Sequence, residues 1–170
     1  LHIPNIDFRT LSNTRLIASL HLKGLPDMNK LSVDLNLKKL TTGRSDIEKL
    51  VSKSMLPQGI ELPNTIGLSG TFKGGMTAFK TNLALVTEKG TAKVDGTVQM
   101  TKRDTLYDAA VNVRDLNIGQ IMKMDSTLGI LSFEGKIKGK GTDPKKLMAN
   151  FDGKVNRLDA MGYRYHDIDM

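Results

Sequence analysis

The stretch from Gly67 to Met100 alternates apolar and polar residues with a period of two over three consecutive runs. Successive side chains of a β-strand point to opposite faces, so each run predicts a strand with one apolar face and one polar face. The turn residues Gly74-Gly75-Met76-Thr77 separate the first run from the second, and Lys89-Gly90 separates the second from the third. Because short connections of this kind join antiparallel neighbours, the stretch predicts a three-stranded antiparallel meander.

The same alternation continues on both sides of this meander and brings the expected number of strands to about ten. The additional runs are His2–Phe8, Arg15–Lys23, Leu31–Lys38, Leu106–Arg114, Leu131–Ile137, Leu147–Val155 and Gly162–Ile168. Proline has no backbone N–H to donate to a sheet, so Pro4 predicts that the first of these strands is either an edge strand or an incoming strand from a missing repeat. The sequence therefore predicts an all-β protein built on an elongated antiparallel sheet.

Two short segments change from the period of a strand to the spacing of a helix. Ser45-Asp46-Ile47-Glu48 has the pattern of a capping box, with Ser at the cap and Glu three residues later. Apolar residues follow this box at helical spacing, so we expect a short helix from about Asp46 to Lys53. A second cap, at Asn117, predicts a helical turn over Asn117–Met122.

The composition of the 170 residues is that of a globular protein, with 39% hydrophobic and 25% charged residues. No apolar run approaches the roughly 18 residues of a membrane-spanning helix, and the absence of Cys excludes disulfide and thiolate chemistry. The net charge of +7 permits anionic partners, but the Lys residues alternate with Asp and Glu along polar strand faces, which indicates a solvated sheet surface. The sequence does not begin with Met, and we expect it to be a segment of a longer protein.

Side chains with catalytic or metal-binding chemistry do not form a recognisable site in the sequence. His2, His21 and His166 are far apart in the chain and lack the spacing of a metal-binding motif. Gly139-Lys140-Gly141 lacks the spacing of a phosphate-binding loop, and no serine has a partner base. The Phe residues fall on the apolar face rather than on a basic platform, which argues against nucleic-acid binding. We therefore expect no enzymatic activity, no cofactor and no metal site, and we interpret the histidines as surface residues.

Two segments of six residues repeat the same pattern. Leu35-Asn36-Leu37-Lys38-Lys39-Leu40 corresponds to Val111-Asn112-Val113-Arg114-Asp115-Leu116, and a predicted helix follows each. After each helix the chain resumes with a Leu-Ser strand, at Leu68-Ser69 and at Leu131-Ser132. This recurrence indicates a single repeat-array segment. Its repeat-like units cover about residues 15–65, 66–129 and 130–170.

Two short helices cannot cover the apolar face of about ten strands. The sequence leaves two alternatives open: the sheet closes into a roll with a side-chain core, or it stays open as a trough for acyl chains. In either case the apolar face should lie opposite to Lys73, Lys80, Lys93, Lys136 and Lys138. The residues predicted to line this apolar face, as candidate groove residues, are Leu20, Leu22, Leu31, Val33, Leu35, Phe72, Phe79, Leu83, Leu85, Val94, Val98, Val111, Phe133, Ile137 and Phe151.

Three motifs of this chain are similar to those of a known superfamily. They are Leu-Ser-Gly-Thr-Phe-Lys-Gly at 68–74, Val-Asn-Val-Arg-Asp-Leu-Asn-Ile-Gly at 111–119 and Gly-Lys-Ile-Lys-Gly-Lys-Gly-Thr-Asp-Pro at 135–144. From about Arg15 to Ile168 the chain resembles the AsmA-like superfamily of Gram-negative bacteria, and within it the TamB (translocation and assembly module) branch of Bacteroidota.

The resemblance implies a periplasmic segment of a long protein that an N-terminal helix, absent from this sequence, holds in the inner membrane. The body of such proteins is a β-sheet curled into an apolar groove, the β-taco, and it carries no catalytic residues. The implied function is phospholipid transfer between the inner and outer membranes and outer-membrane biogenesis. The implied partners are phospholipid acyl chains and an Omp85-class outer-membrane barrel. The alternative is a structural or chaperone-like β-repeat that assists outer-membrane protein assembly through protein–protein contacts.

Overall fold

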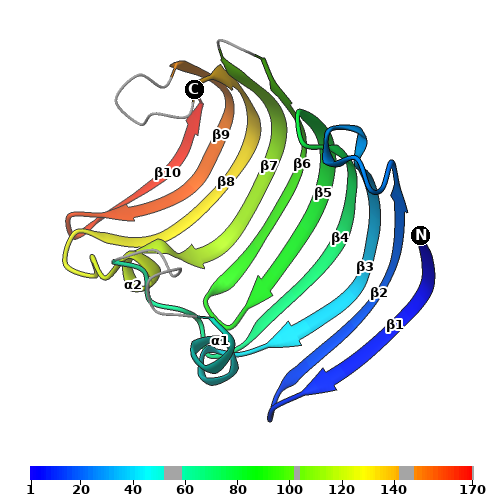
Figure 1. The fold of residues 1–170 in the computed structure, drawn as a ribbon. Helices are drawn as coiled ribbons and strands as arrows, with labels where there is room; N and C mark the ends of the chain where they lie inside the picture. The colour runs from blue at the N-terminus through cyan, green and yellow to red at the C-terminus, as the bar shows by residue number, and fades with distance from the viewer. Residues whose placement is uncertain (52–58, 102–103, 142–147, 170) are drawn as a thin grey trace.

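The computed structural model describes residues 1–51, 59–101, 104–141 and 148–169 of the chain. Ten strands form one sheet, in which each strand pairs antiparallel with the next along the sequence, from β1 at one edge to β10 at the other (Figure 1). The strands are β1 His2–Thr10, β2 Thr14–Lys23, β3 Ser32–Thr42, β4 Ile66–Gly75, β5 Ala78–Thr87, β6 Gly90–Met100, β7 Thr105–Asn117, β8 Leu128–Lys140, β9 Met148–Ala160 and β10 Tyr163–Asp169. The predicted all-β fold, an antiparallel sheet that curls, is confirmed.

Every predicted strand is present, and most strands are longer than the alternation indicated. The first turn of the meander is shorter than expected, because Gly74 and Gly75 belong to β4 and only Met76 and Thr77 connect it to β5. Pro4 lies in β1 at the edge of the sheet. An edge strand forms hydrogen bonds with a neighbour on one side only, so a residue without an N–H is tolerated there. The predicted start of the ninth strand at position 147 lies outside the described residues.

The repeated six-residue signature marks a local irregularity of the sheet. The pairing of β3 with β4 shifts by one residue between Leu37 and Leu40, and the pairing of β7 with β8 shifts in the same way between Val113 and Leu116. Residues three apart in a regular strand point to opposite faces, and the extra residue of a β-bulge returns them to the same face. Each signature therefore keeps its apolar residues on one face where the strand bends.

Residues that pair directly across neighbouring strands share a face, and such pairs join into rows across the sheet. One row crosses all ten strands and is apolar throughout: Phe8, Leu16, Leu40, Leu68, Leu85, Ala92, Val113, Phe133, Val155 and Ile168. Three parallel rows on the same face are Ile6, Ala18, Leu37, Gly70, Leu83, Val94, Val111, Gly135 and Gly153; Ile3, Leu20, Leu35, Phe72, Thr81, Gly96, Ala109, Ile137 and Phe151; and Leu22, Val33, Gly74, Phe79, Val98, Tyr107, Gly139 and Ala149. These four rows are called the inner face below.

The opposite face, called the outer face, carries the charged side chains, including all five lysines predicted to lie there. The Lys73 Nζ lies 3.2 Å from the Asp34 Oδ2, and the Lys138 Nζ lies 3.2 Å from the Asp108 Oδ2. Half or more of each of these side chains is exposed. The outer face is therefore a solvated surface. Surface ion pairs of this kind contribute only about 0–1 kcal/mol each to the free energy of unfolding.

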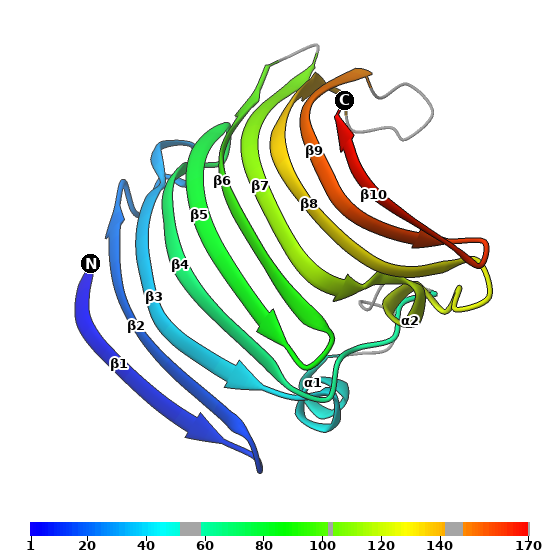
Figure 2. The ribbon, with the colours of Figure 1, turned by 180° about the vertical axis from the view of Figure 1, so that it is seen from behind.

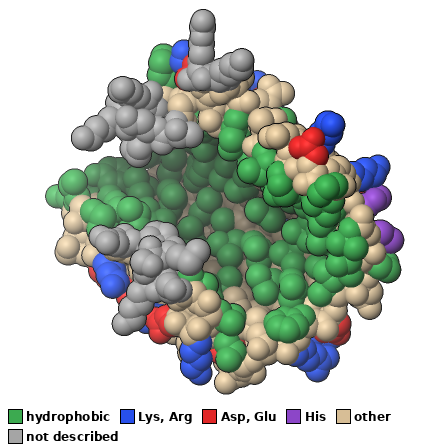
Figure 3. Space-filling view, viewed as in Figure 1, with side chains coloured by type: hydrophobic (Ala, Val, Ile, Leu, Met, Phe, Trp, Pro, Cys, Tyr) green, Lys and Arg blue, Asp and Glu red, His purple; other side chains and the backbone are tan. Residues whose placement is uncertain are grey.

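The sheet curls so that the inner face is concave. Hydrophobic side chains line a hollow that is open toward the viewer in Figure 3. The most buried hydrophobic residues, Ala18, Leu37, Val113, Phe133 and Val155, all belong to the inner face. The hydrophobic core of the protein is therefore the floor of this hollow.

Two short helices lie at the same end of the strands, α1 over Arg44–Leu50 and α2 over Ile118–Met122 (Figure 2). The predicted cap of α2 is confirmed, because the Asn117 side chain accepts a hydrogen bond from the Gln120 N–H at 3.0 Å. The predicted capping box of α1 is wrong, since the cap residue is Gly43, which makes no side-chain cap bond. The predicted end of α1 at position 53 lies outside the described residues.

Gly70 in β4 provides a test of the tight packing between β4 and β5. Its φ of 144° lies in a region that disfavours side chains, and a Cβ at this position would overlap the carbonyl oxygen of Asn82. Gly70→Ala should therefore lower the free energy of unfolding by more than about 2 kcal/mol in urea denaturation. Gly67→Ala in the same strand is the control, because its Cβ would make an ordinary contact at 3.6 Å. Equal stabilities of the two variants would contradict this account.

Candidate functional site

The candidate site is the inner face, which the structure assembles from all ten strands. All of the predicted groove residues except Leu31 lie in its four rows. Leu31 follows a 3₁₀ turn, Met28–Lys30, and precedes β3, so it has no partner in the register. Its apolar character fitted the alternation of β3. The sequence signal for the turn that displaces it is Asp27, whose side chain accepts a hydrogen bond from the Asn29 N–H at 3.0 Å. The role of these residues in lipid binding stays a prediction.

The four rows of the inner face contain no Asp, Glu, Lys, Arg or His residue. Their polar side chains are those of Thr81 and Tyr107. The Thr81 hydroxyl donates to the backbone oxygen of Thr71 at 3.1 Å. Its proton is therefore bonded within the sheet and does not face the hollow as a donor. Because a buried polar group without a partner is costly, this composition suits an apolar occupant and no charged one.

Most of the inner face is only half-buried. Val113, Phe133 and Val155 form a buried cluster, and the partly buried residues around it include Val111 and Phe151. The two edge strands, β1 and β10, do not pair with each other, so the sheet is not closed. Of the two alternatives that the sequence left open, the described part of the chain therefore shows the open sheet rather than the closed roll.

Two pairs of aromatic rings stand on the inner face. Phe72 and Phe79 are stacked with their centroids 4.9 Å apart, and Phe133 and Phe151 are tilted with their centroids 4.7 Å apart. The row between Phe133 and Phe151 passes through Gly135 and Gly153, which pair with each other. Since glycine has no side chain, the two rings can approach to this distance over the Gly135–Gly153 pair. Phe133 is buried, so this ring pair packs into the floor of the hollow.

A buried polar cluster at one end of the inner face was missed by the sequence analysis. Asp46 in α1 is fully buried, and its Oδ2 accepts hydrogen bonds from the Asn13 N–H and the Thr14 hydroxyl, both at 2.8 Å. The Thr14 hydroxyl also lies 2.8 Å from that of Thr42. The hydrogen bond from the Asn13 backbone lowers the pKa of Asp46, although burial opposes this. The cluster joins α1 to the β1–β2 turn.

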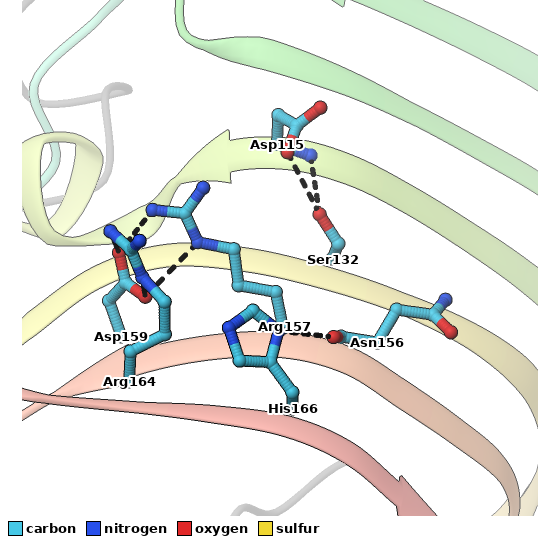
Figure 4. Close-up of polar contacts among 7 residues, drawn as sticks. All are labelled: Asp115, Ser132, Asn156, Arg157, Asp159, Arg164 and His166. Atoms are coloured by element: carbon cyan, nitrogen blue, oxygen red, sulfur yellow. Dashed lines mark hydrogen bonds and ion pairs between the residues drawn. The ribbon is translucent and has the colours of Figure 1, made fainter.

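A second cluster lies at the end of the β9–β10 hairpin (Figure 4). Asp159 accepts a hydrogen bond from the Arg157 Nε at 3.1 Å and one from the Arg164 Nε at 3.0 Å, and these two bonds lower its pKa. Nearby, the Ser132 hydroxyl accepts from the Asp115 N–H at 2.9 Å, at the bulge of β7. These residues belong to the outer side of the sheet and hold its shape rather than line the hollow.

Glu88, in the turn between β5 and β6, binds the segment that leads into β4. Its carboxylate accepts hydrogen bonds from the backbone N–H of Asn64 at 2.6 Å and from the N–H and hydroxyl of Thr65, both at 2.9 Å. Burial alone would raise the pKa of Glu88, but the Thr65 and Asn64 hydrogen bonds outweigh it and lower this pKa to about 2. The negative charge of Glu88 therefore stabilises the folded chain.

The described residues contain no group of three or more His, Cys, Asp or Glu placed to hold a metal ion. In the same ranges, no helix is long and apolar enough to cross a membrane. Comparison of the chain with protein-family models, with curated proteins and with solved structures found no match. The inner face is therefore the feature of this molecule from which a function can be inferred.

Glu88 gives a pH-dependent prediction. Its pKa is lower in the folded chain than the ordinary value of about 4.3 in the unfolded chain, so its contribution to stability is complete above that value and is lost as the pH falls toward about 2. Glu88→Gln should therefore destabilise the protein at about pH 6 and have a smaller effect at about pH 3. Urea denaturation at both pH values measures this difference. An equal loss at the two pH values would exclude the carboxylate charge as the cause.

Asp159 gives a prediction about the β10 edge. Asp159→Asn removes the charge that both arginines bind, so amide hydrogen exchange in β10 should become several-fold faster. Asp167→Asn is the control, because Asp167 forms an exposed ion pair with Lys154 that contributes little. If exchange in β10 is the same in both variants, the Asp159 cluster does not hold this edge.

Proposed function

We propose that this chain is a periplasmic segment of an AsmA-like protein of the TamB type, and that its inner face carries phospholipid acyl chains during transfer between the inner and outer membranes. One observation carries the proposal: the inner face has no charged residue in its four rows, and most of its side chains remain partly exposed in an open sheet. A continuous exposed apolar surface is typical of a binding surface rather than of a structural element alone.

The dimensions of the inner face support an acyl chain as the occupant. Neighbouring strands lie about 4.8 Å apart, so the apolar row across ten strands extends about 40 Å along the sheet. One leaflet of a bilayer has a hydrocarbon thickness of about 15 Å, which is the approximate length of one lipid tail. A tail therefore fits within the rows, and neighbouring tails can follow one another along the sheet.

The chemistry of the two faces assigns the parts of a phospholipid to different places. The inner face offers no charged partner to a phosphate group, so the headgroup stays in water at the mouth of the hollow. The tails exchange contact with water for contact with leucine, valine and phenylalanine side chains. This burial stabilises the bound lipid by about 25 cal/mol for each Å² of apolar surface removed from water. Movement along the groove then replaces one apolar contact by another, which requires no specific binding site.

Photo-crosslinking tests this proposal directly. A photoreactive amino acid in place of Leu83, on the inner face, should form adducts with phospholipid in cells, and mass spectrometry of the purified protein identifies them. The same amino acid in place of Thr97, which is exposed on the outer face, is the control. Adducts at 83 and not at 97 are the expected result. Equal labelling at both positions, or no lipid adduct at 83, would be evidence against a lipid groove.

Leu83→Arg gives a second prediction for the same face. In an open groove the long arginine side chain reaches water at the mouth, so the chain should stay folded, with thermal stability close to that of Thr97→Arg. The charge in the path of the tails costs several kcal/mol in apolar surroundings, so outer-membrane integrity should fail in cells that carry the full-length variant. Unfolding of Leu83→Arg alone would instead indicate a closed core. A folded variant with normal membrane integrity would contradict conduction at this position.

The alternative function, assistance in outer-membrane protein assembly, is favoured by the edges of the sheet. Both β1 and β10 end the strand order, and every residue of β10 is exposed. An edge strand can pair with a further strand of the same longer protein or with an extended strand of another protein, such as a segment of an outer-membrane barrel or of an Omp85-class partner. Protein adducts from photoreactive residues in β10, in the absence of lipid adducts at position 83, would favour this alternative.

A further inference from the structure

His2 and His21, which the sequence separates widely, are direct partners in the sheet. His2 in β1 pairs with His21 in β2, and both side chains lie on the outer face, away from the groove. Their ring centroids are 5.3 Å apart with an angle of 66° between the ring planes. The interpretation of these histidines as surface residues is confirmed, since both are exposed, and pairing between strands brings them together although they are far apart in the chain.

The backbone places this pair where side chains approach most closely. The N–H of Leu22 donates to the carbonyl oxygen of Leu1 at 2.8 Å, and the nitrogen of Leu1 donates to the carbonyl oxygen of Leu22 at 2.9 Å. Leu1 and Leu22 are therefore a hydrogen-bonded pair, and the next pair along an antiparallel ladder is not hydrogen-bonded. At such a pair the Cα atoms lie about 4.5 Å apart, which directs both imidazoles into the same space.

Both rings are available for a ligand. His2 and His21 are exposed, and neither ring has a hydrogen-bond partner among the described residues. The next residue in the same outer row is Asp34, which pairs with His21 across β2 and β3. The Asp34 carboxylate lies 3.2 Å from the Lys73 Nζ, so it contributes negative charge near the rings while it is held by its own partner.

We infer that His2 and His21 form a two-histidine site for a divalent transition-metal ion of the class that prefers imidazole, such as Zn²⁺ or Ni²⁺. A neutral imidazole supplies one nitrogen to the metal, and two imidazoles from neighbouring strands chelate a single ion. Water fills the remaining coordination positions, as in metal sites that keep open positions. The inference is independent of the proposed lipid groove, since the pair lies on the opposite face.

Metal binding should stabilise the pairing of the edge strand β1 with β2. The two ligands lie on different strands, so the ion binds the chain with β1 paired and has no matching site when β1 separates. Binding of this kind stabilises the paired state in proportion to the logarithm of ligand concentration. Metal should therefore slow hydrogen exchange in β1 while leaving exchange at β10 unchanged.

Titration with ZnCl₂ at about pH 7.5 tests the inference. The chain has three histidines, so the ring signals in an NMR spectrum can be followed one by one. His166 is an internal reference, because it lies in β10 at the other edge of the sheet, with its Nδ1 3.2 Å from the Asn156 carbonyl oxygen. The signals of His2 and His21 should shift together and saturate at one ion per chain, while that of His166 does not follow them.

Two variants distinguish this site from weaker modes of binding. His21→Gln should abolish the saturable shift of His2 and the metal-dependent protection of β1, whereas His166→Gln should leave both unchanged. A terminal amine and His2 could chelate a metal without His21, so survival of the His2 shift in His21→Gln would overturn the inference. Equal, non-saturating shifts of all three histidines would overturn it as well.

Discussion

The cross-strand register is the constraint on which the rest of this structure depends. Side chains alternate between two faces with a period of two, so a slip of one residue between any two strands would place a run of lysines and aspartates in the hollow. The row from Phe8 to Ile168 stays apolar over ten strands only because all nine pairings keep the same phase. The ion pairs of the outer face are exposed and weak, so the apolar inner face supplies the main energetic reason for this phase.

The bulges let the strands bend while the apolar residues stay on the inner face. At Leu37–Leu40 and at Val113–Leu116 the chain inserts one residue and continues with its apolar residues on the inner face. The positive φ of Asp115, 49°, and the hydrogen bond from its N–H to Ser132 show how the second bulge is accommodated. Both bulges precede a helix at the same end of the strands, so the repeated six-residue signature encodes a bend and a crossing to the next strand.

The sequence predicted what depends on local pattern and missed what depends on contacts between distant segments. The strands, their two faces and the cap at Asn117 follow from residues within a few positions of one another, and these predictions agree with the structure. The capping-box pattern gave the wrong start for α1, and it also could not show that Asp46 of this helix is buried against Thr14, which is 32 residues away. The pairing of His2 with His21 is invisible until the register is known, because neither residue belongs to a spaced motif.

The open sheet links the stability of this protein to the occupancy of its hollow. Half-buried leucine, valine and phenylalanine side chains on the inner face have completed only part of their transfer from water, and the described chain provides no second layer over them. Any apolar molecule that fills the hollow binds the folded chain and not the unfolded one, so it must raise the stability of the fold. A charged residue in the rows would weaken the binding of an apolar occupant. The uncharged inner face therefore supplies the core of the fold, and under the proposed function the same side chains bind the lipid. The hydrogen-bonded carboxylates Asp46, Glu88 and Asp159 lie at the ends of the strands or on the outer side.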